Sequence, residues 1–303
     1  MIICTGEILV DMVGRMNNGI LQYDRHAGGA PFNVCSAIAK FGGESIFNGA
    51  VGNDLMGSFL IDFSSRQNIR KVYLNIDLKH NTTLAFVDID ENGERNFCFY
   101  RKHTADYHLK PIKEVELKNA NIIHFGSLML SEEEGFEFAQ KEMERAKELG
   151  KYISFDVNFR TDIFKNEKEA LDRYKTILKY VDIVKFSEDE VNIFGKEYVK
   201  NLSQNALVCV SLGKKGSKYI YKNLTNKIPS IKVKPIDTTG AGDAFFAAIL
   251  MNLDGINKNE WNKELLDGIF KFANIAGALT TLKVGAIDGL PSKEEIKKIL
   301  SNC

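Results

Sequence analysis

Short apolar runs alternate with longer amphipathic stretches along most of the chain. The longer stretches at 132–150 and 166–180 carry apolar residues at helical spacing and charged residues on their outer faces. The short runs are typical of buried strands and lie at 1–6, 45–52, 121–127, 151–158, 181–187 and 205–213. This alternation of strands and helices predicts parallel βαβ units and therefore a sheet that is covered by helices on both faces.

Other helices are predicted from their end signals and from the apolar pattern. The stretch 31–43 has Pro31 near its start and Gly42 after its end, which is the usual asymmetry of a helix. A further helix is expected over 54–67. The last third of the chain is mostly helical in pattern, over 241–253, about 261–283 and 292–301.

Residues 81–101 depart from this rhythm and alternate apolar with polar positions. Asn92 and Gly93 lie in the middle of the segment and predict a tight turn between two strands. With the extended segment 11–25, this hairpin predicts a small β-layer that serves as a lid, as a dimer contact or as both. We therefore expect one large domain over 1–303, with an inserted lid formed by about 11–25 and 81–106.

Composition narrows the possible partners. Hydrophobic residues make up 44% and charged residues 26% of the 303 residues, and forty basic residues balance forty acidic ones. A net charge of zero argues against nucleic acid and against an anionic membrane surface as the main partner. The five cysteines have no metal-ligand spacing, and no signal peptide or membrane span is evident. We expect a cytoplasmic protein without nucleic-acid or membrane partners.

The segment 237–245 places two threonines, Gly240, Ala241, Gly242 and Asp243 directly before an apolar helix. The backbone N–H groups at the start of that helix, together with its dipole, form a site for an anion. The segment matches neither the dinucleotide fingerprint, because position 245 is Phe, nor the Walker pattern. Asp243 is then either an ordinary acidic residue in a first helical turn or a general base beside a transferring phosphoryl group.

The stretches "DTTGAGDAF" (237–245) and "GGAPFNVCSAIAKFGG" (28–43) resemble the two signatures of the ribokinase or PfkB family of ATP-dependent sugar kinases. Their order and spacing match that family, and the resemblance extends over essentially the whole chain. It implies a ribokinase-like three-layer α/β/α fold with a mostly parallel central sheet and a small β lid. It also implies ATP and Mg²⁺, a homodimer formed through the lid, and K⁺ bound by backbone carbonyls around 237, 239, 280, 283 and 285.

The resemblance assigns one group of residues to the sugar. Asp11 resembles the aspartate that accepts hydrogen bonds from two sugar hydroxyls, a role suited to an ionised carboxylate. Gly28, Gly29 and Asn33 would meet the same sugar, although Asn33 is also an ordinary first-turn helix residue. Arg101 would reach into the sugar pocket, and Arg160 would lie on the substrate side.

A second group of residues is assigned by resemblance to the nucleotide and its metal. Asn158 is expected near the phosphates, and Ser211, Gly213, Gly216 and Asn274 are expected around ATP. Glu190 would organise Mg²⁺ through water, which suits an ion that keeps much of its hydration shell. Ser187 lies where the family usually has Asn. The acidic run 188–190 is also what a solvated helix start looks like.

The choice of sugar rests on residues 96–109, "NFCFYRKHTADYHL", which resemble the fructokinases of the family. The sequence thus predicts transfer of the γ-phosphoryl group of ATP to the 6-hydroxyl of fructose, with Asp243 as the base and the N–H groups at 240–243 holding the developing charge. A kinase for 2-keto-3-deoxygluconate is the main alternative, because Arg101 and Arg160 could bind a carboxylate. A non-catalytic sugar-binding sensor is the alternative from another class.

Overall fold

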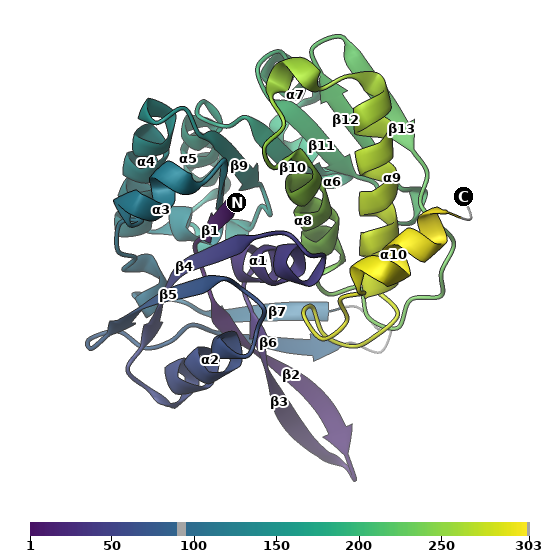
Figure 1. Cartoon of the computed structure of the whole chain (residues 1–303). Coiled ribbons are helices and arrows are strands. Elements are labelled where there is room, and N and C mark those ends of the chain that lie inside the picture. Colours follow the sequence, from purple (N-terminus) through teal and green to yellow (C-terminus); the bar gives the residue numbers. More distant parts are fainter. Residues whose placement is uncertain (90–94, 302–303) are drawn as a thin grey trace.

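The computed structural model describes residues 1–89 and 95–301. Its main feature is a nine-stranded sheet in the order β13-β12-β11-β10-β9-β8-β1-β4-β5 (Figure 1). The strands from β11 to β5 are parallel, and β12 and β13 add an antiparallel edge. The strands are β1 (Ile2–Thr5), β4 (Ser45–Gly52), β5 (Lys71–Asp77), β8 (Ile122–Phe125), β9 (Tyr152–Asp156), β10 (Ile183–Ser187), β11 (Leu207–Ser211), β12 (Ser217–Tyr221) and β13 (Leu224–Ile228).

Helices cover both faces of this sheet, and the central strand β1 packs against both helical layers. Ile2 and Cys4 belong to the core cluster that holds apolar residues of α1 (Ala30–Lys40), α8 (Ala241–Leu253) and α9 (Lys263–Thr280). Ile3 belongs to the opposite cluster, with residues of α4 (Glu133–Glu148) and α5 (Glu167–Leu178). A strand covered on both faces has no polar side, so its continuous apolar run follows from the topology. The expected three-layer α/β/α arrangement is confirmed.

The other helices are α2 (Leu55–Ser65), α3 (Glu114–Asn119), α6 (Glu188–Phe194), α7 (Lys196–Leu202) and α10 (Lys293–Leu300). The helices expected at 54–67, 261–283 and 292–301 are present but shorter. In each case the residue before the helix caps it with its own side chain: Asp54, Asn262 and Ser292 accept a backbone N–H of the first turn. None of the described helices is long and apolar enough to cross a membrane.

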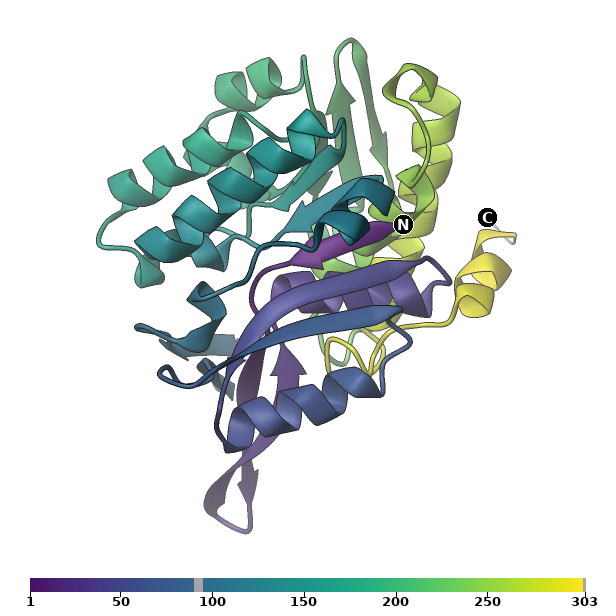
Figure 2. The same ribbon diagram turned by 60° about the vertical axis from the view of Figure 1, so that its left-hand side comes forward.

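A second, four-stranded sheet has the order β3-β2-β6-β7. It consists of β2 (Leu9–Asn17), β3 (Ile20–Gly28), β6 (Leu84–Ile89) and β7 (Arg95–Tyr100), so the two segments expected to form a lid pair within one sheet. The β2–β3 hairpin projects away from the body of the molecule in both views (Figures 1 and 2). The turn predicted at Asn92 and Gly93 lies outside the described residues.

Candidate active site

A cavity of about 880 Å³ opens between the main sheet and the lid sheet. Leu9 of β2 and Phe99 of β7 contribute from the lid sheet, and Gly242 and Asp243 contribute from the start of α8. Asp11, Gly29, Asn33, Asn158, Arg160 and Gly240 also line this cavity, so most of the residues expected at the sugar and the phosphates face one space.

The backbone before α8 is shaped for an anion. Gly240 caps the helix in the left-handed conformation, with φ of 75°. A Cβ atom at this position would also lie 2.6 Å from Cα of Ala286, so only glycine fits. Gly242 and Asp243 occupy the first turn, where an α-helix offers no acceptor for backbone N–H groups. The positive end of the α8 dipole and these donors therefore face the cavity together.

Asp243 is held by a residue from the other signature. Nδ2 of Asn33, in α1, donates a hydrogen bond of 2.8 Å to Oδ2 of Asp243. Burial raises the pKa of Asp243, and the Asn33 hydrogen bond and the charges of Lys185 and Arg160 oppose that rise. Two segments 210 residues apart are thus joined at one carboxylate. Asn33, expected at the sugar, is also a partner of the proposed base.

The turn itself is tied down by Asp237. One carboxylate oxygen accepts the backbone N–H and the hydroxyl of Thr239 at 2.8 and 2.6 Å. The other oxygen accepts the backbone N–H of Gly285 at 2.9 Å. Asp237 therefore connects the glycine turn to the loop after α9.

That loop gathers carbonyl oxygens around one point. A Cβ atom on Gly289 would lie 2.6 Å from the carbonyl oxygen of Gly285, 2.8 Å from that of Thr280 and 3.3 Å from that of Lys283. These are three of the five positions at which backbone ligands for K⁺ are expected. The close approach of these carbonyls therefore requires glycine at 289, whose backbone N–H donates to the carbonyl of Gly285 at 2.9 Å.

A buried ion pair lies under the glycine turn. Nζ of Lys185, in β10, donates to both carboxylate oxygens of Asp156, at the end of β9, at 2.7 and 2.8 Å. The same ammonium lies 3.6 Å from the point that a Cβ of Gly242 would occupy. Burial raises the pKa of Asp156 to about 6, although Lys185 opposes this. Lys185 therefore places a positive charge next to the backbone N–H groups of α8.

The geometry around Asp11 accounts for two glycines. A Cβ on Gly28 would lie 2.2 Å from Oδ2 of Asp11, and a Cβ on Gly29 would lie 2.4 Å from the carbonyl oxygen of Glu7. Glycine at 28 and 29 thus lets β2, β3 and the start of α1 approach closely. Gly28 itself does not line the described cavity, whereas Gly29 and Asp11 do.

Arg101 has a different environment from the one expected. Its guanidinium is buried and donates to Asp106, with Nε at 3.0 Å, to the carbonyl oxygen of Leu128 at 2.6 Å, and to the hydroxyls of Tyr107 and Ser131. Arg101 is not among the residues that line the described cavity. In this structure it anchors the end of β7 to the body of the protein.

A second cavity, of about 620 Å³, lies on the other side of α8 and shares Gly242 and Thr238 with the first. All four residues expected around ATP line it, together with Ala241: Ser211, Gly213, Gly216 and Asn274. Nδ2 of Asn274 donates to the carbonyls of Ile228 and Pro229 at 2.9 and 3.2 Å, so this amide holds the wall of the cavity.

Glu190 and Ser187 form the cap of α6. The Ser187 hydroxyl accepts the backbone N–H of Glu190, and one oxygen of Glu190 accepts the backbone N–H of Ser187 at 2.7 Å. The other oxygen accepts the backbone N–H of Phe159 at 2.7 Å. Each carboxylate oxygen keeps a second lone pair, which can accept a hydrogen bond from a water molecule.

The sequence reasoning missed Lys185 and the role of Asp237. A lysine within the buried strand pattern "IVKFS" was a usable signal, because a buried ammonium needs a partner and usually has a function. The sequence analysis assigns only the backbone carbonyl at 237, as a ligand of K⁺, whereas the side chain of Asp237 organises the turn.

Known proteins resemble this chain over its whole length. The model of the pfkB family carbohydrate kinases matches residues 1–293. "Probable fructokinase-5" of Arabidopsis thaliana is 34% identical over 100% of this chain and 98% of its own length.

Among solved structures, a fructokinase with bound ATP from Xylella fastidiosa has a TM-score of 0.92 at 28% identity and covers 99% of this chain and 98% of its own. A fructokinase from Vibrio cholerae O395 with fructose, ADP and calcium ion has a TM-score of 0.85 at 31% identity, with the same coverage. The fold is therefore of the ribokinase-like type. The chain belongs to the pfkB family of carbohydrate kinases and is an ATP-dependent sugar kinase.

Proposed function

We propose that this protein is an ATP-dependent fructokinase that phosphorylates D-fructose at the 6-hydroxyl, with Asp243 as the general base. The position of Asp243 carries the proposal: its carboxylate faces the first cavity, and the neighbouring Gly242 belongs to both cavities. A hydroxyl in the first cavity and a phosphoryl group from the second would meet at this point. The fructokinases among the relatives support fructose as the sugar.

The chain's own residues divide the reaction between them. Asp11 and Asn33 orient the sugar, and Asp243 accepts the proton of the attacking hydroxyl. The N–H groups of the α8 start, with Lys185 beneath them, stabilise the charge on the transferring group. Mg²⁺ held through water near Glu190 would neutralise phosphate charge. Phe99 and Leu9 of the lid sheet cover the cavity and keep water from accepting the phosphoryl group.

Arg101 bears on the choice between fructose and a sugar acid. Two arginines in the cavity would suit a carboxylate, but the guanidinium of Arg101 is engaged by Asp106 and Leu128. Of these two arginines, only Arg160 lines the cavity. This arrangement favours fructose over 2-keto-3-deoxygluconate. The carboxylate of Asp243 lies beside the backbone N–H groups that form the anion site. This arrangement likewise favours an enzyme over a sugar-binding sensor.

Two further parts of the proposal concern K⁺ and assembly. The convergent carbonyls around Gly289 support K⁺ binding beside the glycine turn. Exposed apolar side chains at the end of the β2–β3 hairpin, Met16, Ile20 and Leu21, support a homodimer that forms through the lid.

The substrate is tested by measuring sugar-dependent ADP release with fructose, 2-keto-3-deoxygluconate, ribose and glucose. We expect the highest kcat/KM for fructose. The position of phosphorylation is tested by adding phosphoglucose isomerase and glucose-6-phosphate dehydrogenase, which convert fructose 6-phosphate but not fructose 1-phosphate to a readable signal. Preference for the keto-deoxy acid would replace fructose by the alternative, and ADP release without the coupled signal would contradict the 6-hydroxyl.

A further inference from the structure

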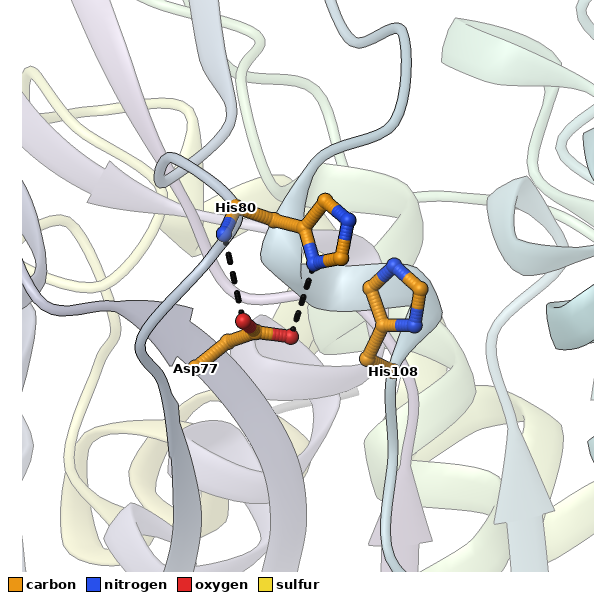
Figure 3. A group of neighbouring side chains, drawn as sticks. All are labelled: Asp77, His80 and His108. Atoms are coloured by element: carbon orange, nitrogen blue, oxygen red, sulfur yellow. Dashed lines mark hydrogen bonds and ion pairs between the residues drawn. The ribbon is translucent and has the colours of Figure 1, made fainter.

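Three side chains with metal-binding chemistry lie together away from both cavities. Asp77 is the last residue of β5, His80 lies in the following loop, and His108 follows the short 3-10 helix Ala105–Tyr107 (Figure 3). One potential ligand atom from each lies within 4.8 Å of the others, and all three residues are partly buried. None of them lines the first or the second cavity.

The carboxylate of Asp77 already fixes one histidine. Oδ1 accepts the backbone N–H of Lys79 at 2.7 Å. It also accepts the backbone N–H of His80 at 3.1 Å, and Oδ2 lies 3.0 Å from Nδ1 of His80 (Figure 3). This contact leaves Nε2 of His80 for another partner. A carboxylate behind a ligating imidazole is the usual way in which proteins orient the ring and raise its basicity toward a metal.

His108 is held by its backbone and not by its ring. Its carbonyl oxygen accepts from Nδ2 of Asn75 at 3.0 Å, and its N–H donates to Ala105 at 2.9 Å. Within the described ranges 1–89 and 95–301, its ring nitrogens have no recorded hydrogen bond. The ring stacks on that of His80, with centroids 3.9 Å apart and planes 15° apart.

The stack places the donors near one another, but it is not itself a coordinated arrangement. Imidazole lone pairs lie in the ring plane, so two nearly parallel rings cannot both point at an ion between them. Rotation of the His108 ring about its Cβ–Cγ bond breaks no hydrogen bond between this ring and the described residues. Such a rotation needs to bring the two nitrogens to about 3.3 Å, the spacing on a tetrahedral ion with bonds of about 2.0 Å.

We propose that His80 and His108, with Asp77 orienting the His80 ring, form a binding site for a divalent transition-metal ion of the Zn²⁺ or Co²⁺ type, distinct from the Mg²⁺ that accompanies ATP. Two imidazoles suit Zn²⁺, Co²⁺, Ni²⁺ or Cu²⁺, whereas Mg²⁺ prefers oxygen ligands and water. Partial exposure leaves an entry path and room for water to complete the coordination.

The position of the site gives the ion a structural consequence. His80 precedes β6 and His108 follows β7, so the ion joins the two connections that lead into and out of the lid sheet. The backbone N–H of Ala105 already donates to the carbonyl of Asn81 at 2.9 Å between these connections. A metal bridge beside this hydrogen bond restricts how the base of the lid moves relative to β5.

The test uses the full chain, stripped of metal, in a Cys98→Ser background because the thiol of Cys98 is exposed and binds such ions on its own. Co²⁺ is titrated in excess Mg²⁺ and followed by its visible absorption, and Zn²⁺ is measured by displacement. We expect one equivalent to bind, with the apparent melting temperature raised by saturating ion. The variant His80→Gln/His108→Gln should bind at least about 10-fold more weakly.

The matched control is His103→Gln, because the side chain of His103 is 83% exposed and lies outside the cluster. It should bind Co²⁺ like the parent. Equal affinity in the double variant and the parent, or no stoichiometric binding by the parent, would overturn the proposal. A measurement without ligand substitutions is the paramagnetic broadening of amide NMR signals by Co²⁺, which should be strongest at 77–80 and 105–108. Broadening centred elsewhere would also reject the site.

Discussion

The glycine turn before α8 and the β2–β3 hairpin of the lid differ in how their residues are held. At the turn, Asp237 binds three donors, and Asn33 reaches Asp243 from the neighbouring helix α1. At the end of the hairpin, the apolar side chains of Met16 and Ile20 are 69% and 64% exposed. Several hydrogen bonds therefore hold the turn in place, whereas apolar side chains at the end of the hairpin are exposed to solvent.

This difference matches the roles that we propose for the two regions. A site that stabilises charge works when its dipoles are fixed before the reaction, because reorganising them costs free energy. The end of the hairpin projects away from the body, and segments with few contacts are those that move most readily. Changes in the turn should therefore affect kcat, and changes in the hairpin should affect assembly and sugar affinity.

The largest effect should come from Asp243→Asn. Loss of the base should lower kcat by roughly 10²–10⁴-fold, whereas fructose binding should change little. Because the base has to be ionised and burial raises the pKa of Asp243, kcat of the parent should fall as pH is lowered through that pKa. Steady-state kinetics and fructose titration measure both quantities. Asp189→Asn, on the exposed part of α6, is the control. Turnover near that of the parent would remove Asp243 as the base.

Glu7, in the connection between β1 and β2, tests how the fold tolerates a buried carboxylate. Its side chain is fully buried, neither carboxylate oxygen has a hydrogen-bond partner among the described residues, and burial raises its pKa from 4.5 to about 8. The unfolded chain releases this proton above pH 4.5 and the folded chain only near pH 8. The residue therefore costs stability progressively as pH rises through this window, and nothing below it.

In Glu7→Gln this cost is absent. The free energy of unfolding of the variant, relative to the parent, should rise between pH 4.5 and pH 8 by at most about 5 kcal/mol. Urea unfolding of both proteins at several pH values measures the difference. Parallel pH profiles would show that Glu7 is ionised in the folded protein.

Lys185→Met should have a smaller effect on catalysis than loss of the base. Removing a charge-assisted donor beside Gly242 should lower kcat by about 10- to 100-fold, with little change in KM for fructose. Because a buried pair is broken, melting temperatures are compared alongside, and Asp156→Asn serves as a variant that keeps the ammonium. Lys218→Met, an exposed lysine of β12, is the neutral control. A rise in KM with unchanged kcat would assign Lys185 to sugar binding instead.

The smallest effect on chemistry should come from the hairpin. Ile20→Ser/Leu21→Ser should weaken a lid-mediated dimer by about 1–2 kcal/mol, because less apolar surface is buried on association. Sedimentation velocity over a range of protein concentrations measures this, with Leu55→Ser of α2, also an exposed apolar side chain, as the control. If both variants sediment like the parent at every concentration, the hairpin is not the contact.

The sequence predicted features that depend on neighbouring residues better than features that depend on packing. The start of α8 was predictable because Gly240 and Gly242 are close in the chain and helix geometry fixes which backbone N–H groups lack an acceptor within the helix. The Lys185–Asp156 pair was not readable, because it depends on β10 pairing with β9 in one register. Arg101 was expected in the cavity, but a partner only five residues later, Asp106, turns its side chain into the body. Contacts such as this ion pair determine the direction in which a side chain points after the end of a strand.

The hydrogen bond between Asn33 and Asp243 also bears on how the protein is made. A chain emerging from the ribosome presents α1 long before α8, and domains generally fold from the N-terminal side as synthesis proceeds. α8 carries mostly buried residues and packs in the same core as α1. The apolar side chains of α1 therefore lack these partners until α8 has been synthesised. The nascent protein therefore acquires Asp11 and Asn33, proposed to bind the sugar, before Asp243, the proposed base. A chain shorter than 243 residues lacks that carboxylate altogether.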